Sequence, residues 1–177
     1  MTPAELIACE DRLVNHWLAG EVNGISHFCG SQDGKYEEWL CRLFADEVKP
    51  TDWVFASHRS HYHFLLHGGS FEHLEAQVLK GRSMALYGPR FVSSAIVAGV
   101  TGIAAGTALA AQQRGTGEHV WCFIGDGGEE QGGFAEAVWF VADRQLPCTF
   151  IIEDNGSSCG VTKAERRGRH WQERPWP

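Results

Sequence analysis

The sequence lacks the features that mark secreted, disulfide-rich or nucleic-acid-binding proteins. Its six cysteines include no C-x-x-C pair and several lie in apolar runs, so we expect reduced core thiols in a cytoplasmic protein. The N-terminus shows no basic-then-apolar leader, which speaks against secretion. A formal net charge of -7 gives no general attraction to nucleic acid or to an anionic membrane surface.

Long hydrophobic runs, internal repeats and low-complexity tracts are also missing. The most uniformly apolar stretch, residues 97–111, is too short and too rich in glycine and threonine to span a bilayer. With 177 residues, 44% of them hydrophobic and 21% charged, the chain has the size and composition of one globular domain. We expect an N-terminal helical segment (1–50), a sheet core (51–156) and a C-terminal tail (157–177).

Helical periodicity and capping signals predict several helices. The clearest is amphipathic, with Thr2-Pro3 as a start signal and Gly20 as a stop. Residues 95–110 suit a buried helix in which Gly102-x-x-x-Gly106 lets another backbone approach closely. Such a face would serve either tight packing inside the domain or a subunit interface. The amphipathic helix covers residues 2–19, and the other expected helices cover residues 36–46, 70–79, with Ser70 as the cap, and 134–143.

Two apolar runs with a helical segment between them predict a strand, loop, helix, strand unit. The first run, residues 119–124, ends in a Gly-Asp-Gly-Gly loop, and the second, residues 148–152, ends in Glu-Asp-Asn-Gly. In an open parallel sheet both loops lie at the carboxyl edge of the strands, where ligands bind. A further short strand is expected at residues 53–56. The pattern predicts an α/β fold.

Polar side chains at this sheet edge could share a small hard cation. Asp126 and Asn155 offer oxygen atoms, and a backbone carbonyl near Ser157 could add a third ligand, leaving room for two diphosphate oxygens on magnesium. The N–H groups of Gly127 and Gly128 open a helix and could hold a phosphate. The same residues also suit a plain turn at the end of a strand, and spacing alone leaves both interpretations open.

Histidines gather after the strand at residues 53–56. Imidazole is a common zinc ligand, but no cysteine is close in sequence. Arg59, between two of these histidines, favours an anion site that holds phosphate oxygens. His27, in a glycine-rich loop, is by default a solvated or capping residue. The four histidines are His58, His61, His63 and His67.

The Gly-Asp-Gly loop is part of a longer pattern that resembles the thiamine diphosphate motif, which begins with G-D-G and closes with an asparagine. From about His27 to about Arg167 the chain resembles the alpha subunit of the thiamine-dependent first component of 2-oxo acid dehydrogenase complexes, the pyruvate type in particular. The motif residues are Gly125-Asp126-Gly127, Gln131-Gly132, Glu136-Ala137, Leu146-Pro147 and Glu153-Asp154-Asn155. Further matching segments are His27-x-x-x-x-Gln32, Pro50-Thr-Asp52, Arg59-x-His61, Ser83-Met84, Ile96-Val97 and Ala105-x-x-x-Leu109.

This resemblance implies a doubly wound, mainly parallel sheet flanked by helices, and it implies a role for each matching residue. Asp126, Asn155 and the Ser157 carbonyl would bind magnesium. His27 and His61 would serve in catalysis, and the backbones of Ala95 and Val97 would hold the aminopyrimidine ring. The cofactor-binding set is His27, His58, Arg59, Ala95, Val97, Gly125, Asp126, Gly127, Gly128 and Asn155.

The resemblance also implies partners. The glutamate that activates the cofactor would come from a separate beta-type chain with a pyrimidine-binding domain, in an α2β2-like hetero-oligomer. The substrate would be a small 2-oxo acid, and a lipoyl-bearing acyltransferase could accept the acyl group. The alternatives are transketolase-like ketol transfer, a simple decarboxylase or carboligase subunit, and a non-catalytic structural or regulatory subunit.

Several positions depart from the family pattern. His58 stands where the family usually has a tyrosine, Ala85 where it often has a histidine, and Asp154 where it has the first of two asparagines. The chain ends at Pro177, whereas the family continues with a loop that carries histidines used in acyl transfer. We therefore expect cofactor binding to be better supported than transfer to lipoamide.

Overall fold

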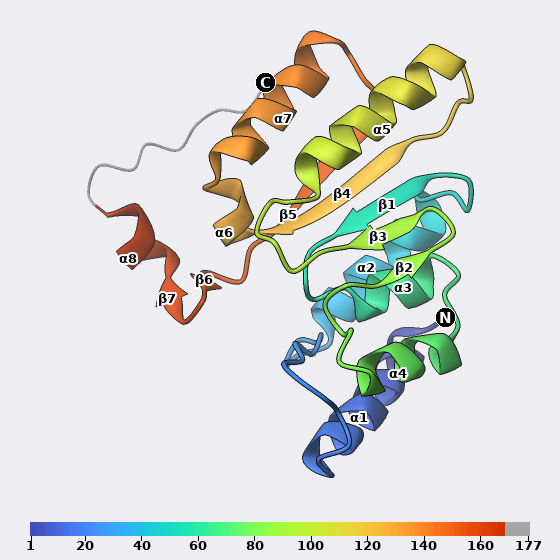
Figure 1. Ribbon diagram of the computed structural model, residues 1–177, viewed down its shortest axis with the longest axis vertical. Coiled ribbons are helices and arrows are strands. Elements are labelled where there is room, and N and C mark those ends of the chain that lie inside the picture. Colours follow the sequence, from blue (N-terminus) through green and yellow to red (C-terminus); the bar gives the residue numbers. More distant parts are fainter. Residues whose placement is uncertain (169–177) are drawn as a thin grey trace.

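The computed structural model describes residues 1–168 and shows an α/β fold built on one five-stranded sheet (Figure 1). β1 pairs in parallel with β3 on one side and β4 on the other, and β4 pairs in parallel with β5. Only the edge strand β2 runs antiparallel, against β3. In spatial order the strands are β2 (Tyr87–Gly88), β3 (Phe91–Ser93), β1 (Trp53–Ala56), β4 (Val120–Gly125) and β5 (Cys148–Glu153).

Helices cover both faces of this sheet, which confirms the doubly wound, mainly parallel architecture (Figure 1). One face carries α1 (Pro3–Leu18), α2 (Lys35–Asp46), α3 (His61–Leu66) and α4 (Phe71–Leu79). The other face carries α5 (Thr101–Arg114), α6 (Asp126–Glu129) and α7 (Gly132–Asp143). A small hairpin, β6 (Ser157–Ser158) and β7 (Val161–Thr162), and the short helix α8 (Lys163–Arg167) follow β5.

The strands send alternate side chains into two separate cores. Val54 and Phe123 pack with the N-terminal helices, while Phe55 and Cys122 pack with α5 and α7. Because both sheet faces are covered, the central strands are apolar throughout, as parallel strands usually are. Burying one such large apolar side chain stabilises the fold by about 1.5–3 kcal/mol.

Local capping chemistry sets the predicted helix starts. Thr2 Oγ1 accepts the Glu5 N–H at 3.3 Å, and Glu5 Oε2 accepts the Thr2 N–H at 2.7 Å, which is a complete capping box. Ser70 Oγ likewise accepts the His73 N–H at the start of α4. The strand expected at residues 53–56 and the helices expected at 36–46 and 134–143 are confirmed within two residues of their predicted ends.

The helix expected from residue 95 begins only at Thr101, so that prediction is wrong at its start. Ala98 has a φ of 56°, a left-handed conformation that an α-helix does not contain, and residues 94–100 form a loop. The helix is also buried on one side only. Gly102 and Gly106 are exposed and a Cβ added to either would meet nothing within 4 Å, so these glycines do not serve tight packing within the described chain. Their role in a subunit interface stays a prediction.

The cysteines are all free, as expected, but not all lie in the core. Cys122 is buried and burial raises the pKa of its thiol well above the ordinary value, whereas Cys159 is exposed. Across residues 1–168 no helix has both the length and the apolar character needed to cross a bilayer. The expected C-terminal tail contains β6, β7 and α8, and its last residues, 169–177, lie outside the described part of the chain.

Candidate functional site

A cavity of about 930 Å³ opens at the carboxyl ends of β1, β4 and β5. From β1 the chain goes to β3 on one side of β1 and then crosses to β4 on the other side. Such a reversal of strand order leaves a crevice at the carboxyl edge, which is where open α/β sheets bind their ligands. The topology therefore places the cavity where a ligand site is expected.

The cavity brings together eleven of the twelve residues predicted from the sequence. They come from the loop before α2, the loop after β1, the loop after β3, the β4–α6 junction and the segment after β5. The predicted residues that line it are His27, His58, Arg59, Ala95, Val97, Gly125, Asp126, Gly127, Gly128, Asn155 and Ser157. His61 does not line it.

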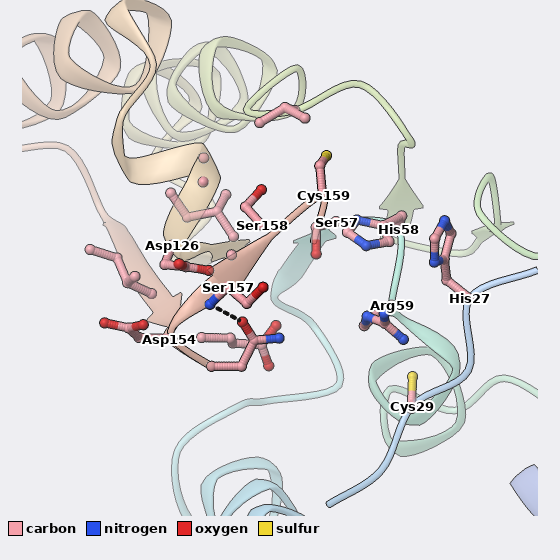
Figure 2. Close-up of a pocket in the computed structure, with 18 of the residues that line it drawn as sticks. His27, Cys29, Ser57, His58, Arg59, Asp126, Asp154, Ser157, Ser158 and Cys159 are labelled. Atoms are coloured by element: carbon pink, nitrogen blue, oxygen red, sulfur yellow. Dashed lines mark hydrogen bonds between the residues drawn. The ribbon is translucent and has the colours of Figure 1, made fainter. Parts of the chain in front are cut away.

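One wall of the cavity carries nitrogen donors (Figure 2). The rings of His27 and His58 meet edge to face with their centroids 4.7 Å apart, and Arg59 Nη1 donates to the Phe28 carbonyl at 2.5 Å. Burial lowers the pKa of His27, and the charge of Arg59 adds to the effect. Burial also lowers the pKa of His58, with His27 and Arg59 as further causes. One guanidinium and two imidazoles thus face the cavity, a donor set suited to phosphate oxygens.

The opposite wall carries oxygen acceptors (Figure 2). Asp126 lies in the first turn of α6 with 2% of its surface exposed. Asn155 Oδ1 accepts the Ser157 N–H at 3.0 Å, which fixes the turn that follows β5. A carboxylate, an amide oxygen and backbone carbonyls are the ligands that hard cations such as magnesium prefer. The donor set of this wall therefore fits a magnesium ion.

Glycines shape the floor between the two walls. A Cβ at Gly127 would stand 2.3 Å from Ser158 Oγ and 2.8 Å from Ser158 Cβ, so any larger residue there would require Ser158 to move. A Cβ at Gly128 would be 3.3 Å from Ile124 Cβ. Both N–H groups belong to the first turn of α6, where no intrahelical acceptor precedes them. This floor gives a ligand close access to backbone donors, so the residues present fit a magnesium diphosphate.

Basic side chains of α8 pair with the carboxylates around Asp126. The Arg166 guanidinium contacts Asp126 and also donates to Glu130 at 3.0 Å. This pairing holds the pKa of Glu130 below its ordinary value. The remaining ion pairs of α8 at this end of the cavity are Lys163 with Asp154, Arg167 with Glu129 and Arg167 with Glu130.

The loop at residues 94–98 forms a third side of the cavity. Ser94 Oγ accepts the Ile96 N–H at 3.2 Å, and Ala98 holds its left-handed backbone conformation two residues later. Ile96 and Val97 are 74% and 51% exposed. An irregular loop presents backbone groups that a helix would have used internally, so the late start of α5 makes backbone contacts from Ala95 and Val97 sterically accessible.

Sequence reasoning missed several residues that line the cavity. Tyr36 Oη donates to Glu153 Oε1 at 2.6 Å, and His63 Nε2 lies 3.1 Å from the same oxygen. Burial, together with Glu153, raises the pKa of Tyr36 well above its ordinary value. Glu153 ends β5 directly before Asp154 and Asn155. Its position at the carboxyl edge of the sheet could therefore have identified it as a residue of the site. Cys159 and Trp39 also line the cavity, and no sequence pattern indicated them.

The structure corrects one prediction about the histidines, the catalytic role of His61. His61 is fully buried, with Nδ1 2.9 Å from Glu10 Oε1 and Nε2 3.0 Å from Ser83 Oγ, so it does not contact a ligand in the cavity as a catalytic residue must. The histidine group forms no common metal site, because His63 reaches Glu153 and His67 reaches the Asp52 carbonyl.

Within residues 1–168 one cluster has the ligand types and proximity of a metal site: Glu10, Cys29 and His61, whose ligand atoms lie within 4.8 Å of one another. Hydrogen bonds already occupy the Glu10 carboxylate and both ring nitrogens of His61. Burial also raises the pKa of the Cys29 thiol well above its ordinary value, which disfavours the thiolate that binds metals. We interpret this cluster as a hydrogen-bond network.

Comparison with known proteins gives consistent matches to one family. The profile of the family described as "Dehydrogenase E1 component" matches residues 8–172. The testis-specific alpha subunit of the human pyruvate dehydrogenase E1 component is 32% identical over 155 residues, which are 82% of this chain and 38% of that protein. The somatic alpha subunit from Sus scrofa is 30% identical, with the same shares covered. Both relatives are named as mitochondrial forms.

A solved structure gives a weaker match. It is an enzyme isolated from Mycobacterium smegmatis and described as thiamin diphosphate-dependent, with a TM-score of 0.46, 18% identity, and coverage of 68% of this chain and 20% of that one. With a TM-score below 0.5, this likeness adds nothing to the assignment. The chain spans about 38% of the length of the curated relatives it matches. On the family profile and the identity to these relatives, the chain belongs to the dehydrogenase E1 component family.

Proposed function

We propose that this chain binds the magnesium diphosphate end of thiamine diphosphate, as the alpha-type subunit of an enzyme that decarboxylates a small 2-oxo acid and transfers its acyl group. The observation that carries the proposal is the cavity itself. A wall of nitrogen donors at His27, His58 and Arg59 faces a wall that carries the Asp126 carboxylate (Figure 2). Asn155 also lines the cavity. A diphosphate with its cation needs both kinds of wall at once.

Each wall then has a defined task. Asp126, Asn155 and the Ser157 carbonyl hold the cation, and Arg59 with the two imidazoles holds the phosphate oxygens. The N–H groups of Gly127 and Gly128 approach the diphosphate from the floor. Bound thiamine diphosphate supplies a carbon nucleophile and an electron sink for the decarboxylation, so this chain contributes positioning and electrostatics.

The cation must also displace a side chain that is already there. Arg166 contacts Asp126, so a magnesium ion that uses this carboxylate takes the place of the guanidinium. Arg166 keeps a partner after the exchange, because it also pairs with Glu130. The α8 segment is therefore the part of the site that we expect to rearrange when the cofactor binds.

The proposed enzyme needs a second chain. The one glutamate that lines the described cavity, Glu153, is hydrogen-bonded to Tyr36 and His63, and the relatives found by comparison are named as subunits. We propose a beta-type partner in an α2β2-like assembly, with the exposed α5 face around Gly102 and Gly106 as the contact surface. A lipoyl-bearing acyltransferase is the proposed acyl acceptor, and the cytoplasmic location stays a prediction.

A non-catalytic subunit is the second candidate function. The observation that favours it is the pairing of Asp126 with Arg166, which gives the carboxylate a counter-charge without any cofactor. Ketol transfer and simple decarboxylation use the same cofactor geometry and differ in the acceptor. They are therefore distinguished by their products once cofactor binding is established.

Calorimetric titration tests the proposed function. Thiamine diphosphate with magnesium is titrated into the chain alone and into its complex with the co-purifying chain. We expect saturable binding in the complex and much weaker binding when magnesium is replaced by a chelator. Absence of binding in the complex would overturn the enzyme assignment and favour the non-catalytic subunit.

Replacing Arg59 with alanine is expected to weaken diphosphate binding without abolishing it. Hydrogen bonds to charged groups contribute about 1.5–3 kcal/mol, which corresponds to roughly a 10- to 100-fold loss of affinity. His27 and His58 still supply donors. The same titration measures the change, with inorganic pyrophosphate as a second ligand. An effect on thiamine diphosphate but none on pyrophosphate would show that Arg59 does not contact the phosphates.

A further inference from the structure

Three buried polar side chains form a chain of hydrogen bonds behind the cavity wall that carries His27 and Arg59. His61 Nδ1 lies 2.9 Å from Glu10 Oε1, and His61 Nε2 lies 3.0 Å from Ser83 Oγ. Glu10 is 4% exposed, and His61 and Ser83 are fully buried. The three residues come from α1, α3 and the loop after α4, so the chain joins segments that are distant in sequence.

Each end of this chain is connected to a segment that lines the cavity. Glu10 Oε1 accepts the Cys29 N–H at 2.6 Å, two residues after His27. His61 follows Arg59 by two residues, and Ser83 is followed directly by Met84, which lines the cavity. Arg59 in turn donates to the Phe28 carbonyl at 2.5 Å, so the loop around His27 and the loop around Arg59 are joined twice.

The polar character of this chain is not explained by packing alone. Placing a carboxylate and an imidazole in a core carries a desolvation cost, and apolar residues of similar volume often stabilise a protein as well or better. Hydrogen bonds between fixed partners, however, set side-chain orientation more narrowly than apolar contacts do. Within the described residues, α1 contributes no side chain to the cavity, so it reaches the site indirectly, through the hydrogen bond of Glu10 with the Cys29 N–H and the ring contact of Trp17 with Phe28.

We propose that Glu10, His61 and Ser83 are positioning residues that hold His27 and Arg59 in place for the diphosphate. The His61 ring bridges the other two residues, with Nδ1 at the Glu10 carboxylate and Nε2 at the Ser83 hydroxyl. Removing the Glu10 carboxylate breaks one of the two links between the loop at residues 27–31 and the start of α3, and removing the Ser83 hydroxyl leaves the His61 ring held at Nδ1 alone. The proposal rests on the proposed function, because it takes the diphosphate as the ligand that the loops around His27 and Arg59 bind.

The test compares Glu10→Gln and Ser83→Ala with Asp52→Asn as a matched control. Asp52 is a carboxylate that is 1% exposed, accepts the His119 N–H and the Trp121 Nε1–H, and does not line the cavity. We expect all three variants to lower the thermal midpoint. Only Glu10→Gln and Ser83→Ala should weaken the binding of magnesium thiamine diphosphate, by about tenfold or more, as for other residues that orient a ligand's direct contacts.

Hydrogen exchange gives a readout that does not depend on the cofactor. In Glu10→Gln the amides of residues 27–31 and 57–61 should exchange faster than in the original chain, while in Asp52→Asn they should not. The double variant Glu10→Gln with Ser83→Ala should lose less affinity than the two single losses combined, because both act through His61.

The outcomes separate the two proposals. If the original chain in its complex fails to bind the cofactor, the proposed function falls, and hydrogen exchange alone decides whether the network orders the loops. If the original chain binds, and Glu10→Gln and Ser83→Ala lose stability but keep both the affinity and the exchange rates, the network is a stabilising core feature and the positioning role is wrong. Ser83→Ala removes a single oxygen, so it keeps the test valid should Glu10→Gln fail to fold.

Discussion

Replacing Asp126 with alanine should abolish the binding of magnesium and thiamine diphosphate while leaving the sheet folded. Asp126 is the only carboxylate among the three proposed cation ligands, and 2% of its surface is exposed. Because variants of residues that merely support a metal ligand lose about 10- to 100-fold in affinity, loss of this direct ligand should exceed about 100-fold. Calorimetric titration of the complex with magnesium thiamine diphosphate measures this loss of affinity.

Asp154→Asn is the matched control for this variant. Asp154 also lines the cavity and also pairs with a basic residue of α8, Lys163, but it is not a proposed cation ligand. A partly exposed ion pair contributes about 0–1 kcal/mol, so we expect less than about a fivefold change in affinity. Equal losses in both variants would point to general electrostatics, and an unchanged affinity in Asp126→Ala would rule out the metal assignment.

A methyl group at Gly127 should disrupt the site by steric collision. The Cβ of alanine would stand 2.3 Å from Ser158 Oγ and 2.8 Å from Ser158 Cβ, and the hairpin of β6 and β7 would have to move away. Overpacking of this kind costs about 1–3 kcal/mol. We expect Gly127→Ala to lower the free energy of unfolding in urea by that amount and to weaken cofactor binding, since Ser157 moves with Ser158.

Gly132→Ala separates this collision from the general effect of losing a glycine. Gly132 begins α7, and a Cβ there meets nothing within 4 Å. Alanine in a helix is favoured over glycine by about 0.4–1 kcal/mol, so this variant should be as stable as the original chain or more so. If both variants behaved alike, the close approach of Gly127 to Ser158 would have no energetic consequence.

The elements that were predictable from sequence are those whose signals are local. Thr2 and Ser70 cap their helices with their own side chains, and both starts were predicted from these residues. The six-residue helix α3 was missed because it has no side-chain cap and is too short to show a period. Its stability comes from tertiary contacts, which no window of sequence reports.

In the candidate site, too, the residues placed by local signals were predictable and the pairings made by tertiary contacts were not. The carboxyl ends of parallel strands share one edge, so Asp126 and Asn155 could be placed in one cavity from their positions after two strands. The partner of His61 lies 51 residues away on α1, and the partner of Asp126 lies 40 residues away on α8. Neither pairing has a signature in spacing, so nothing in the sequence opposed the catalytic role that the resemblance implied for His61, and Arg166 was overlooked.

The ion pairs of α8 mean that the acidic end of the cavity carries its own counter-ions. Lys163, Arg166 and Arg167 neutralise carboxylates that would otherwise repel one another across a small volume. A metal ion that binds Asp126 therefore replaces Arg166 as the counter-charge of this carboxylate. Its measured affinity reports the difference in free energy between the Asp126–metal and Asp126–Arg166 pairings. The same feature lets the chain keep an ordered acidic loop before any cofactor reaches it.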